Sequence, residues 1–187
     1  LLRRAIALDP AFARAHEGLA GTLLVGVDAG VLPLDARQEA QREAEHALAL
    51  DPRLAGARGI LACLKALRGE WSEAERNFTI ALEYDQSNPV VHGAFAQHVL
   101  LPTGLRGRAR AHAERALELS PARAGASMLC ALCEANRGDH AAISNYINMA
   151  VMLGMSERYP PLRVLRADCL LAEGRLEEAG TEAAAAL

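Results

Sequence analysis

A short phrase that ends a helix recurs along this 187-residue chain and constrains its fold more than any other feature. The four copies are Ala5-Ile-Ala-Leu-Asp-Pro10, Ala47-Leu-Ala-Leu-Asp-Pro52, Ala81-Leu-Glu-Tyr-Asp-Gln86 and Ala116-Leu-Glu-Leu-Ser-Pro121. Proline cannot continue a helix, because it lacks the backbone N–H and clashes with the preceding turn. Each copy therefore predicts the end of a helix, and the last two copies end 35 residues apart.

A second phrase lies upstream of these helix ends. Its copies are Gly69-Glu-Trp-Ser-Glu-Ala74, Gly138-Asp-His-Ala-Ala-Ile143 and Gly174-Arg-Leu-Glu-Glu-Ala179. Glycine closes one helix, and the polar residues after it begin the next. The first two copies are 69 residues apart and the last two are 36 apart. These spacings indicate a period of about 34 residues with two helices in each period.

Composition supports helices and argues against sheet-based folds. The chain has 39 Ala and 29 Leu but only 17 Val, Ile and Thr together. Helices favour Ala and Leu, whereas sheets favour β-branched and aromatic residues. A β-sandwich, a β-barrel and a βαβ enzyme are therefore disfavoured, and a mean hydropathy near zero argues against disorder. No apolar run approaches the ~18 residues that a membrane span needs.

The chain resembles the tetratricopeptide repeat (TPR) family, whose second helix carries small residues around a large one and ends at proline. Ala74, Phe78 and Ala81 match this pattern in full. Two further sets have Ala in the large position: Ala40, Ala44 and Ala47, and Ala109, Ala113 and Ala116. A fourth set matches more loosely: Ile143, Ile147 and Ala150. The resemblance implies an all-α, right-handed superhelical solenoid of antiparallel helix pairs, with Ala74 and Ala81 where the two helices of a repeat cross.

We expect a single solenoid over residues 1–187 with about five repeats. Residues 1–8 are expected to be the tail of a truncated repeat, and both ends to expose an unfinished stack, as in a fragment of a longer protein. The expected repeats are 11–52, 53–88, 89–121, 122–157 and the incomplete 160–187. Their expected helices are 11–25 and 36–49, 53–68 and 71–84, 89–101 and 106–118, 122–137 and 140–153, and 160–173 and 176–187.

The first repeat contains an insertion, because Pro10 and Pro52 are 42 residues apart. The extra residues lie in the loop 25–35, which carries five aliphatic side chains: Val25, Val27, Val31, Leu32 and Leu34. They either tuck under the loop as a small core or contact a neighbouring domain. The stretched repeat, the Leu-Asp-Pro and the Glu-Trp-Ser-Glu-Ala segment also resemble the TPR arrays of bacterial signalling proteins. Those arrays are attached to winged-helix transcription regulators, class III adenylate cyclases or kinases.

Residues typical of catalysis or metal binding do not form a recognisable set. Cys130 and Cys133 have redox spacing, but they lie inside a predicted helix, and free cysteine is commonly buried. The six histidines are scattered and form no ligand spacing, and no phosphate-binding glycine loop is present. We therefore expect no catalytic residues, no cofactor and no metal, and hence no enzymatic activity.

One basic cluster begins a predicted second helix. It consists of Arg106, Arg108, Arg110 and Arg115. Positive charge at a helix N-terminus opposes the helix dipole. The cluster is either a solvated face paired with Glu114 and Glu118 or a contact for an acidic or phosphate-bearing partner. Aromatic side chains that stack on bases are absent nearby, which disfavours RNA.

The resemblance places a binding groove along the first helix of each pair. The candidate lining is Gly59, Cys63 and Ala66; Gly93, Gln97 and Leu100; Met128, Leu132 and Ala135; and Val164, Asp168 and Leu171. This surface is small and apolar, and it lacks the Lys, Arg and Asn set of chaperone-binding relatives. It suits an apolar helix or an extended segment of a partner. The alternative, of equal weight, is that these residues pack against the neighbouring repeat. A register shift of one residue would move them from the groove into the core.

The leading functional hypothesis is a non-catalytic protein–protein interaction scaffold, the regulatory part of a larger bacterial signalling or transcription-regulator protein. It would bind a protein or peptide segment, with neighbouring domains on the same chain. The alternative is an accessory array that presents substrate to a catalytic domain such as an adenylate cyclase or a transferase. A net charge of −3 argues against nucleic-acid partners. The cytoplasm is the default compartment, and the periplasm is the alternative if the parent is a membrane-tethered regulator.

Overall fold

In the computed structural model, which describes residues 1–135, 137–157 and 159–187, every regular element in those ranges is a helix. Two compact units are present, Leu1–Val99 and Leu100–Leu187. The predicted all-α architecture of paired antiparallel helices is confirmed. None of the helices in the described ranges is long and apolar enough to cross a bilayer.

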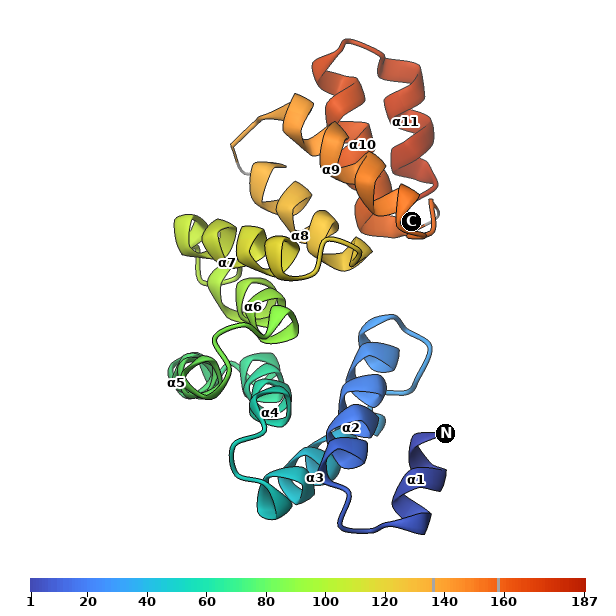
Figure 1. Ribbon diagram of the computed structural model, residues 1–187. Coiled ribbons are helices and arrows are strands. Elements are labelled where there is room, and N and C mark those ends of the chain that lie inside the picture. Colours follow the sequence, from blue (N-terminus) through green and yellow to red (C-terminus); the bar gives the residue numbers. More distant parts are fainter. Residues whose placement is uncertain (136, 158) are drawn as a thin grey trace. The chain divides into compact units, whose positions relative to one another are not determined.

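Unit 1 contains two complete helix pairs and part of a third (Figure 1). Its elements are α1 (Leu2–Leu8), α2 (Ala13–Asp28), α3 (Ala36–Leu50), α4 (Ala55–Leu67), α5 (Trp71–Tyr84), α6 (Pro89–Phe95) and the π-helix η1 (Ala96–Leu100), whose last residue belongs to unit 2. Helices α2 and α3 pack together, as do α4 and α5. Helix α4 also packs against α2 and α6, so the first helices of successive pairs lie side by side.

Unit 2 repeats this plan. Its helices are α7 (Arg106–Leu119), α8 (Ala124–Ala135), α9 (His140–Met152), α10 (Pro160–Ala172) and α11 (Leu176–Ala184). Helices α8 and α9 form one pair and α10 and α11 the next, while α7 packs against α8 and α9 against α10. The expected third repeat, 89–121, is thus divided between the two units. The repeat boundaries within a single solenoid stay a prediction.

Small side chains are fully buried where the two helices of a pair meet. The predicted positions are all at most 1% exposed: Ala40, Ala44, Ala47, Ala74, Phe78, Ala81, Ala109, Ala113, Ala116, Ile143, Ile147 and Ala150. Packed helices lie ~8–10 Å apart and need small residues at their closest points. The recurrent alanines therefore allow the close approach, and larger residues such as Phe78 fill the space towards the next pair.

The recurrent helix-ending phrase works through its aspartate as well as its proline. Asp9 and Asp51 follow their helices in an extended conformation, and Asp85 follows its helix at φ −146° and ψ 89°. Each of the three carboxylates accepts the backbone N–H two residues later, at 3.0–3.1 Å. This local bond competes with continuation of the helix. In the third copy, which has Gln86 instead of proline, the aspartate alone accompanies the helix end.

The structure departs from the expected helices at the end of α2 and in the segment 89–101. Helix α2 continues to Asp28 instead of ending near Val25, because Gly26 stays helical and Leu32 packs directly against it. The expected helix 89–101 becomes α6 followed by η1, a π-helix in which each turn holds an extra residue. Nothing in the composition of Ala96–Leu100 distinguishes a π-helix from an α-helix.

The inserted loop is partly folded onto the protein and partly exposed. The N–H groups of Val31 and Leu32 both donate to the carbonyl of Gly26 at 2.9 Å. Leu32 packs against a core cluster that contains Leu19 and Leu23, and Val27 is buried. The other three aliphatic side chains are 68–77% exposed: Val25, Val31 and Leu34. Val27 and Leu32 therefore agree with the small-core interpretation, and the other three aliphatic residues do not.

Phe78 joins successive helix pairs in unit 1. Its ring is fully buried and stacks on Phe95 of α6, with centroids 4.9 Å apart and planes at 16°. Stacked aromatic pairs add to the stabilisation that comes from buried area. Phe78 therefore fixes the position of α6 against α5.

We predict that Phe78→Ala lowers the free energy of unfolding by about 3–5 kcal/mol, the usual cost of truncating a buried aromatic residue. Chemical denaturation followed by circular dichroism measures the change. Met152→Ala, at a side chain 88% exposed, is the control and should change stability by less than about 0.5 kcal/mol. Equal losses in the two variants would contradict this role for Phe78.

Candidate partner-binding face

The partner-binding face is defined here as the predicted groove positions on the first helices of the pairs. In unit 1 its α4 positions are buried: Gly59, Cys63 and Ala66, the latter two each 3% exposed. A Cβ placed on Gly59 would lie 3.3 Å from Cγ2 of Val91 in α6. Packing thus accounts for Gly59, as the alternative interpretation allows.

The next predicted positions are split by η1. Gly93 in α6 is half-buried, Gln97 is exposed and Leu100 is fully buried. A π-helix turns by less per residue than an α-helix. Positions chosen at α-helical spacing therefore do not stay on one face, which accounts for Leu100 being in the core.

In unit 2 the face becomes progressively more open. On α8, Met128 is buried, and Leu132 and Ala135 are half-buried against a core cluster that includes Ile147 and Leu162. On α10 all three predicted positions are exposed: Val164 and Leu171 are each 55% exposed, and Asp168 lies between them. Their spacing of four and three residues places them on one stripe of the helix.

Asp168 gives this stripe a negative charge. Its carboxylate lies 3.5 Å from Nε2 of His140 at the start of α9, and its side chain is 50% exposed. The α10 stripe therefore presents a solvent-accessible carboxylate between two apolar side chains.

Unit 1 carries a polar group close to its part of the face. Asp28 at the end of α2 pairs with Arg37 at the start of α3, with Oδ1 and Nη2 3.6 Å apart. Burial, helped by the charge of Asp28, raises the pKa of Cys63 to about 12. Burial lowers the pKa of His98 in η1. The negative charge of Asp28 partly offsets this decrease, and the positive charge of Arg37 adds to it. Asp28 and Arg37 thus lie within electrostatic range of η1, and Asp28 also acts on α4.

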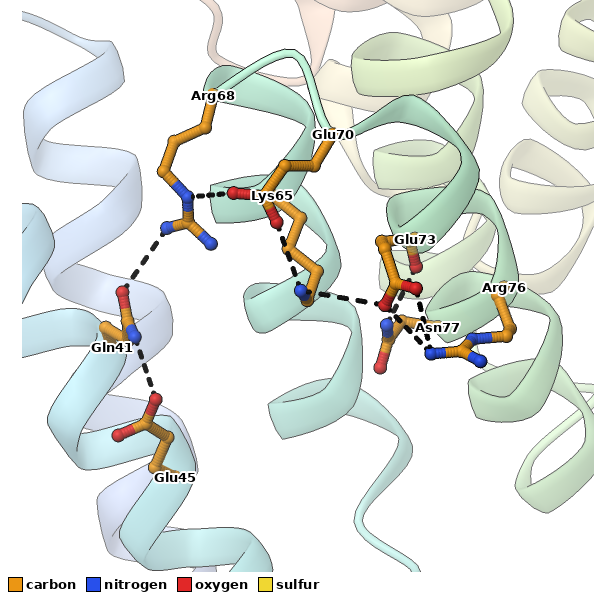
Figure 2. Close-up of polar contacts among 8 residues, drawn as sticks. All are labelled: Gln41, Glu45, Lys65, Arg68, Glu70, Glu73, Arg76 and Asn77. Atoms are coloured by element: carbon orange, nitrogen blue, oxygen red, sulfur yellow. Dashed lines mark hydrogen bonds and ion pairs between the residues drawn. The ribbon is translucent and has the colours of Figure 1, made fainter.

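A network of polar contacts joins α3, α4 and α5 (Figure 2). Arg68 donates to Glu70 at 2.6 Å and to Gln41 at 3.4 Å, and Gln41 donates to Glu45 at 2.8 Å. Lys65, the only lysine of the chain, donates to Glu70 at 3.1 Å. These hydrogen bonds from Arg68 and Lys65 lower the pKa of the half-buried Glu70.

The same network continues along α5. Glu73 lies 3.7 Å from Nζ of Lys65 and accepts from Arg76 at 2.8 Å, and its backbone carbonyl accepts from Asn77 at 2.7 Å. Three cations and three carboxylates take part in the whole network, so their charges balance. The network links helices and leaves no net charge to attract a ligand.

In unit 2 a buried carboxylate occupies the position that corresponds to Lys65. Glu134 has a side chain only 5% exposed and lies 3.2 Å from Nε of Arg110 and 3.3 Å from Nε of Arg137. Arg110 also donates to Glu114 at 2.7 Å. A charge removed from water is tolerated when it is paired, so Arg110 compensates Glu134 and ties α7 to α8.

The pairs expected for the basic cluster are present. Arg110 pairs with Glu114, and Arg115 pairs with Glu118 at 3.0 Å. The solvated-face interpretation accounts for Arg115, whereas Arg110 is half-buried and also pairs with the buried Glu134.

The four thiols lie in surroundings that disfavour the thiolate form. All four cysteines are buried and free. Burial is the main cause that raises the pKa of Cys130 to about 12 and of Cys133 to about 11, and it also raises the pKa of Cys169. The thiolate is the nucleophile and the metal ligand, so these cysteines favour packing over redox chemistry. Within the described ranges, His, Cys, Asp and Glu side chains form no group of three that suits a metal ion.

Sequence reasoning missed Asp28, Arg37 and His98, and it did not single out Glu134. Glu134 lies nine residues before Ile143, as Lys65 lies nine before Ala74, so aligning the repeats gives a usable signal for it. The convergence of Asp28, Arg37 and His98 has no such signal, because it depends on how α2 ends and on the π-helix.

Comparison with known proteins supports the fold. No family model matches the chain, and no curated protein is similar to it in sequence. Among solved structures, Pseudomonas aeruginosa PilF is 21% identical, with a TM-score of 0.70 over 93% of this chain and 74% of that chain. TTC0263, a thermophilic TPR protein of Thermus thermophilus, is 22% identical, with a TM-score of 0.66 over 88% of each chain.

YrrB, described as a TPR protein with an unusual peptide-binding site, is 18% identical, with a TM-score of 0.59 over 100% of this chain and 90% of that chain. At these identities the likeness concerns the fold. The chain therefore has the TPR-like fold of an α-α solenoid.

We predict that Arg110→Ala lowers the free energy of unfolding by about 1–3 kcal/mol, because it leaves the buried Glu134 with one counter-charge instead of two. Denaturation of Arg110→Ala, Glu134→Gln and the double variant measures the coupling. The double variant should recover part of the loss, since a neutral amide needs no cation. Arg115→Ala, which breaks an exposed pair, serves as the control, and an equally large loss there would refute the assignment.

We predict that His98 makes the protein less stable in mild acid. The pKa of His98 lies below its ordinary 6.5 in the folded chain, so the unfolded chain takes up the proton first as pH falls. The contribution is present above pH 6.5 and is lost as pH falls towards the folded-state pKa. Thermal melts from pH 7.5 to 5 should show a shallower decline for His98→Gln than for the wild type, and parallel curves would contradict the prediction.

Proposed function

We propose that the chain is a non-catalytic protein–protein interaction module that binds a partner segment on the first helices of its pairs. The observation that carries the proposal is the α10 stripe, where Val164, Asp168 and Leu171 are all exposed. An exposed apolar pair around a carboxylate suits a segment with apolar side chains and a basic group between them. Half-buried Leu132 and Ala135 of α8 are the adjoining predicted positions in the same unit.

Electrostatics and chemistry favour binding over catalysis. The thiols are buried with raised pKa values, and the polar network around Lys65 is balanced in charge. YrrB, which shares the fold, is described as having a peptide-binding site. That description supports a peptide or protein segment as the kind of ligand for this chain.

We infer that the module serves a larger bacterial signalling or transcription-regulator protein. The stretched first repeat supports this context, since it resembles the TPR arrays of such proteins, and 19 arginines against one lysine fit a GC-rich bacterial genome. Sequencing of the parent gene tests it. A winged helix or a cyclase domain beside the array would support it, and an unrelated neighbour would count against it.

We predict that Val164→Arg weakens partner capture by about tenfold or more, because it replaces one of the two apolar contacts of the stripe with a positive charge, which also repels the basic group expected in the partner. Affinity capture from the source cells, quantified by mass spectrometry, compares it with the wild type. Met152→Arg is the matched control, since Met152 is an exposed apolar residue of α9 outside the face. Capture that is equal in all three proteins, or absent with the wild type, would overturn the proposal.

A further inference from the structure

The register of the repeats explains why the α10 stripe is exposed. Gly69, Gly138 and Gly174 follow α4, α8 and α10 at a positive φ, so positions on these helices can be compared by their distance from the glycine. The positions ten, six and three residues before it are Gly59, Cys63 and Ala66; Met128, Leu132 and Ala135; and Val164, Asp168 and Leu171. The three sets therefore correspond.

On α4 and α8 this face is covered by the first helix of the following pair. A Cβ placed on Gly59 would lie 3.3 Å from Cγ2 of Val91 in α6. Met128 shares a buried cluster with α10, and Leu132 and Ala135 pack against that cluster. Each covering helix presents buried apolar side chains three or four residues apart: Val91 and Phe95 on α6, and Leu162 and Leu165 on α10.

The second helices follow the same rule. Phe78 of α5 stacks on Phe95 of α6, and Ile147 of α9 lies in one cluster with residues of α10, so both are at most 1% exposed. Ala183 of α11 is the corresponding residue, nine after the glycine, and it is exposed. Within the ranges that the structure describes, no helix thus covers the side of α10 and α11 that would receive a following first helix.

This uncovered side differs from the covered ones by one charge. Asp168 occupies the position of Cys63 and Leu132, and its side chain is 50% exposed. The two arginines of α10 pair with carboxylates of other segments. The contact of Asp168 with His140 is an ion pair only when that ring is protonated. A helix that covered Asp168 without supplying a cation would bury a poorly compensated carboxylate, so the charge selects a basic partner.

We propose that the α10 stripe and Ala183 dock one amphipathic helix of a partner protein, which stacks on α10 as α10 stacks on α8 and places a lysine or arginine against Asp168. The inference rests on the proposed function and gives the partner segment a conformation and a charge. A helix is favoured over an extended segment because helices cover the two corresponding faces. A partner protein is favoured over a second copy because the charge must be complemented.

A synthetic helix serves as the probe. It is a lactam-stapled, alanine-based peptide with leucines at the spacing of Leu162, Leu165 and Cys169, and with arginine, glutamine or glutamate as the one varied residue beside them. Fluorescence anisotropy at low salt measures its binding to the intact chain. The arginine peptide should bind at least about tenfold more tightly than the glutamate peptide, with the glutamine peptide between them.

Substitutions in the chain assign the binding to this face. Asp168→Arg should reverse the preference, so that the glutamate peptide binds more tightly than the arginine peptide. Glu83→Arg, at an exposed position of α5 in unit 1, changes the net charge equally and should keep the original preference. Val164→Arg should weaken the arginine peptide, whereas Met152→Arg should not. Circular dichroism checks that each variant is folded.

A preference that Asp168→Arg fails to reverse, or no binding of the arginine peptide at ~1 mM, would overturn the inference. Equal binding of an unstapled peptide that contains proline would also overturn it, because the ligand would not need to be a helix. Self-association that depends on Val164, measured by sedimentation, would assign the face to a second copy instead. If these tests fail while partner capture still depends on Val164, the proposed function stands and only the helical, basic partner is rejected.

Discussion

The close approach of the two helices in each pair is the constraint on which the rest of this structure depends. Fully buried alanines at Ala40, Ala44, Ala74 and Ala81 leave no room for larger side chains at the crossings. Because these positions are filled by methyl groups, the larger residues that hold successive pairs together lie beside them, as Phe78 does against Phe95. The surface chemistry of the first helices is then free to differ from pair to pair.

The sequence predicts this framework well because its signals are local. Glycine at a positive φ, aspartate that accepts the N–H two residues later and alanine at a crossing all act within a few residues or within one helix pair. They reveal where helices end and which face is buried. The end of α2 is less readable, because Gly26 is compatible with both a helix end and a helix interior, and the packing of Leu32 decides between them.

The candidate face is harder to predict, since the exposure of a side chain depends on what covers it. Cys63 and Asp168 occupy corresponding positions of two first helices, yet one is buried and the other exposed. The π-helix adds a second difficulty, because it shifts Leu100 into the core without a compositional signal. The sequence therefore identifies the right helices, while the choice of residues on them needs tertiary contacts.

The charged residues next to the crossing alanines differ from one helix pair to the next. Lys65 and Glu134 occupy corresponding positions but carry opposite charges, and each is held by counter-charges nearby. Gln41 and Arg110 also occupy corresponding positions, each directly after a crossing alanine. Gln41 accepts from Arg68, the residue that follows α4, whereas Arg110 pairs with Glu134 of α8. If α8 and α9 were moved to follow α3, Glu134 would be buried opposite an amide and would keep only Arg137 of its two cations. The ion pairs therefore favour the present order of the repeats. A duplicated or shuffled helix pair would need new charged residues to compensate its buried charges at the new position.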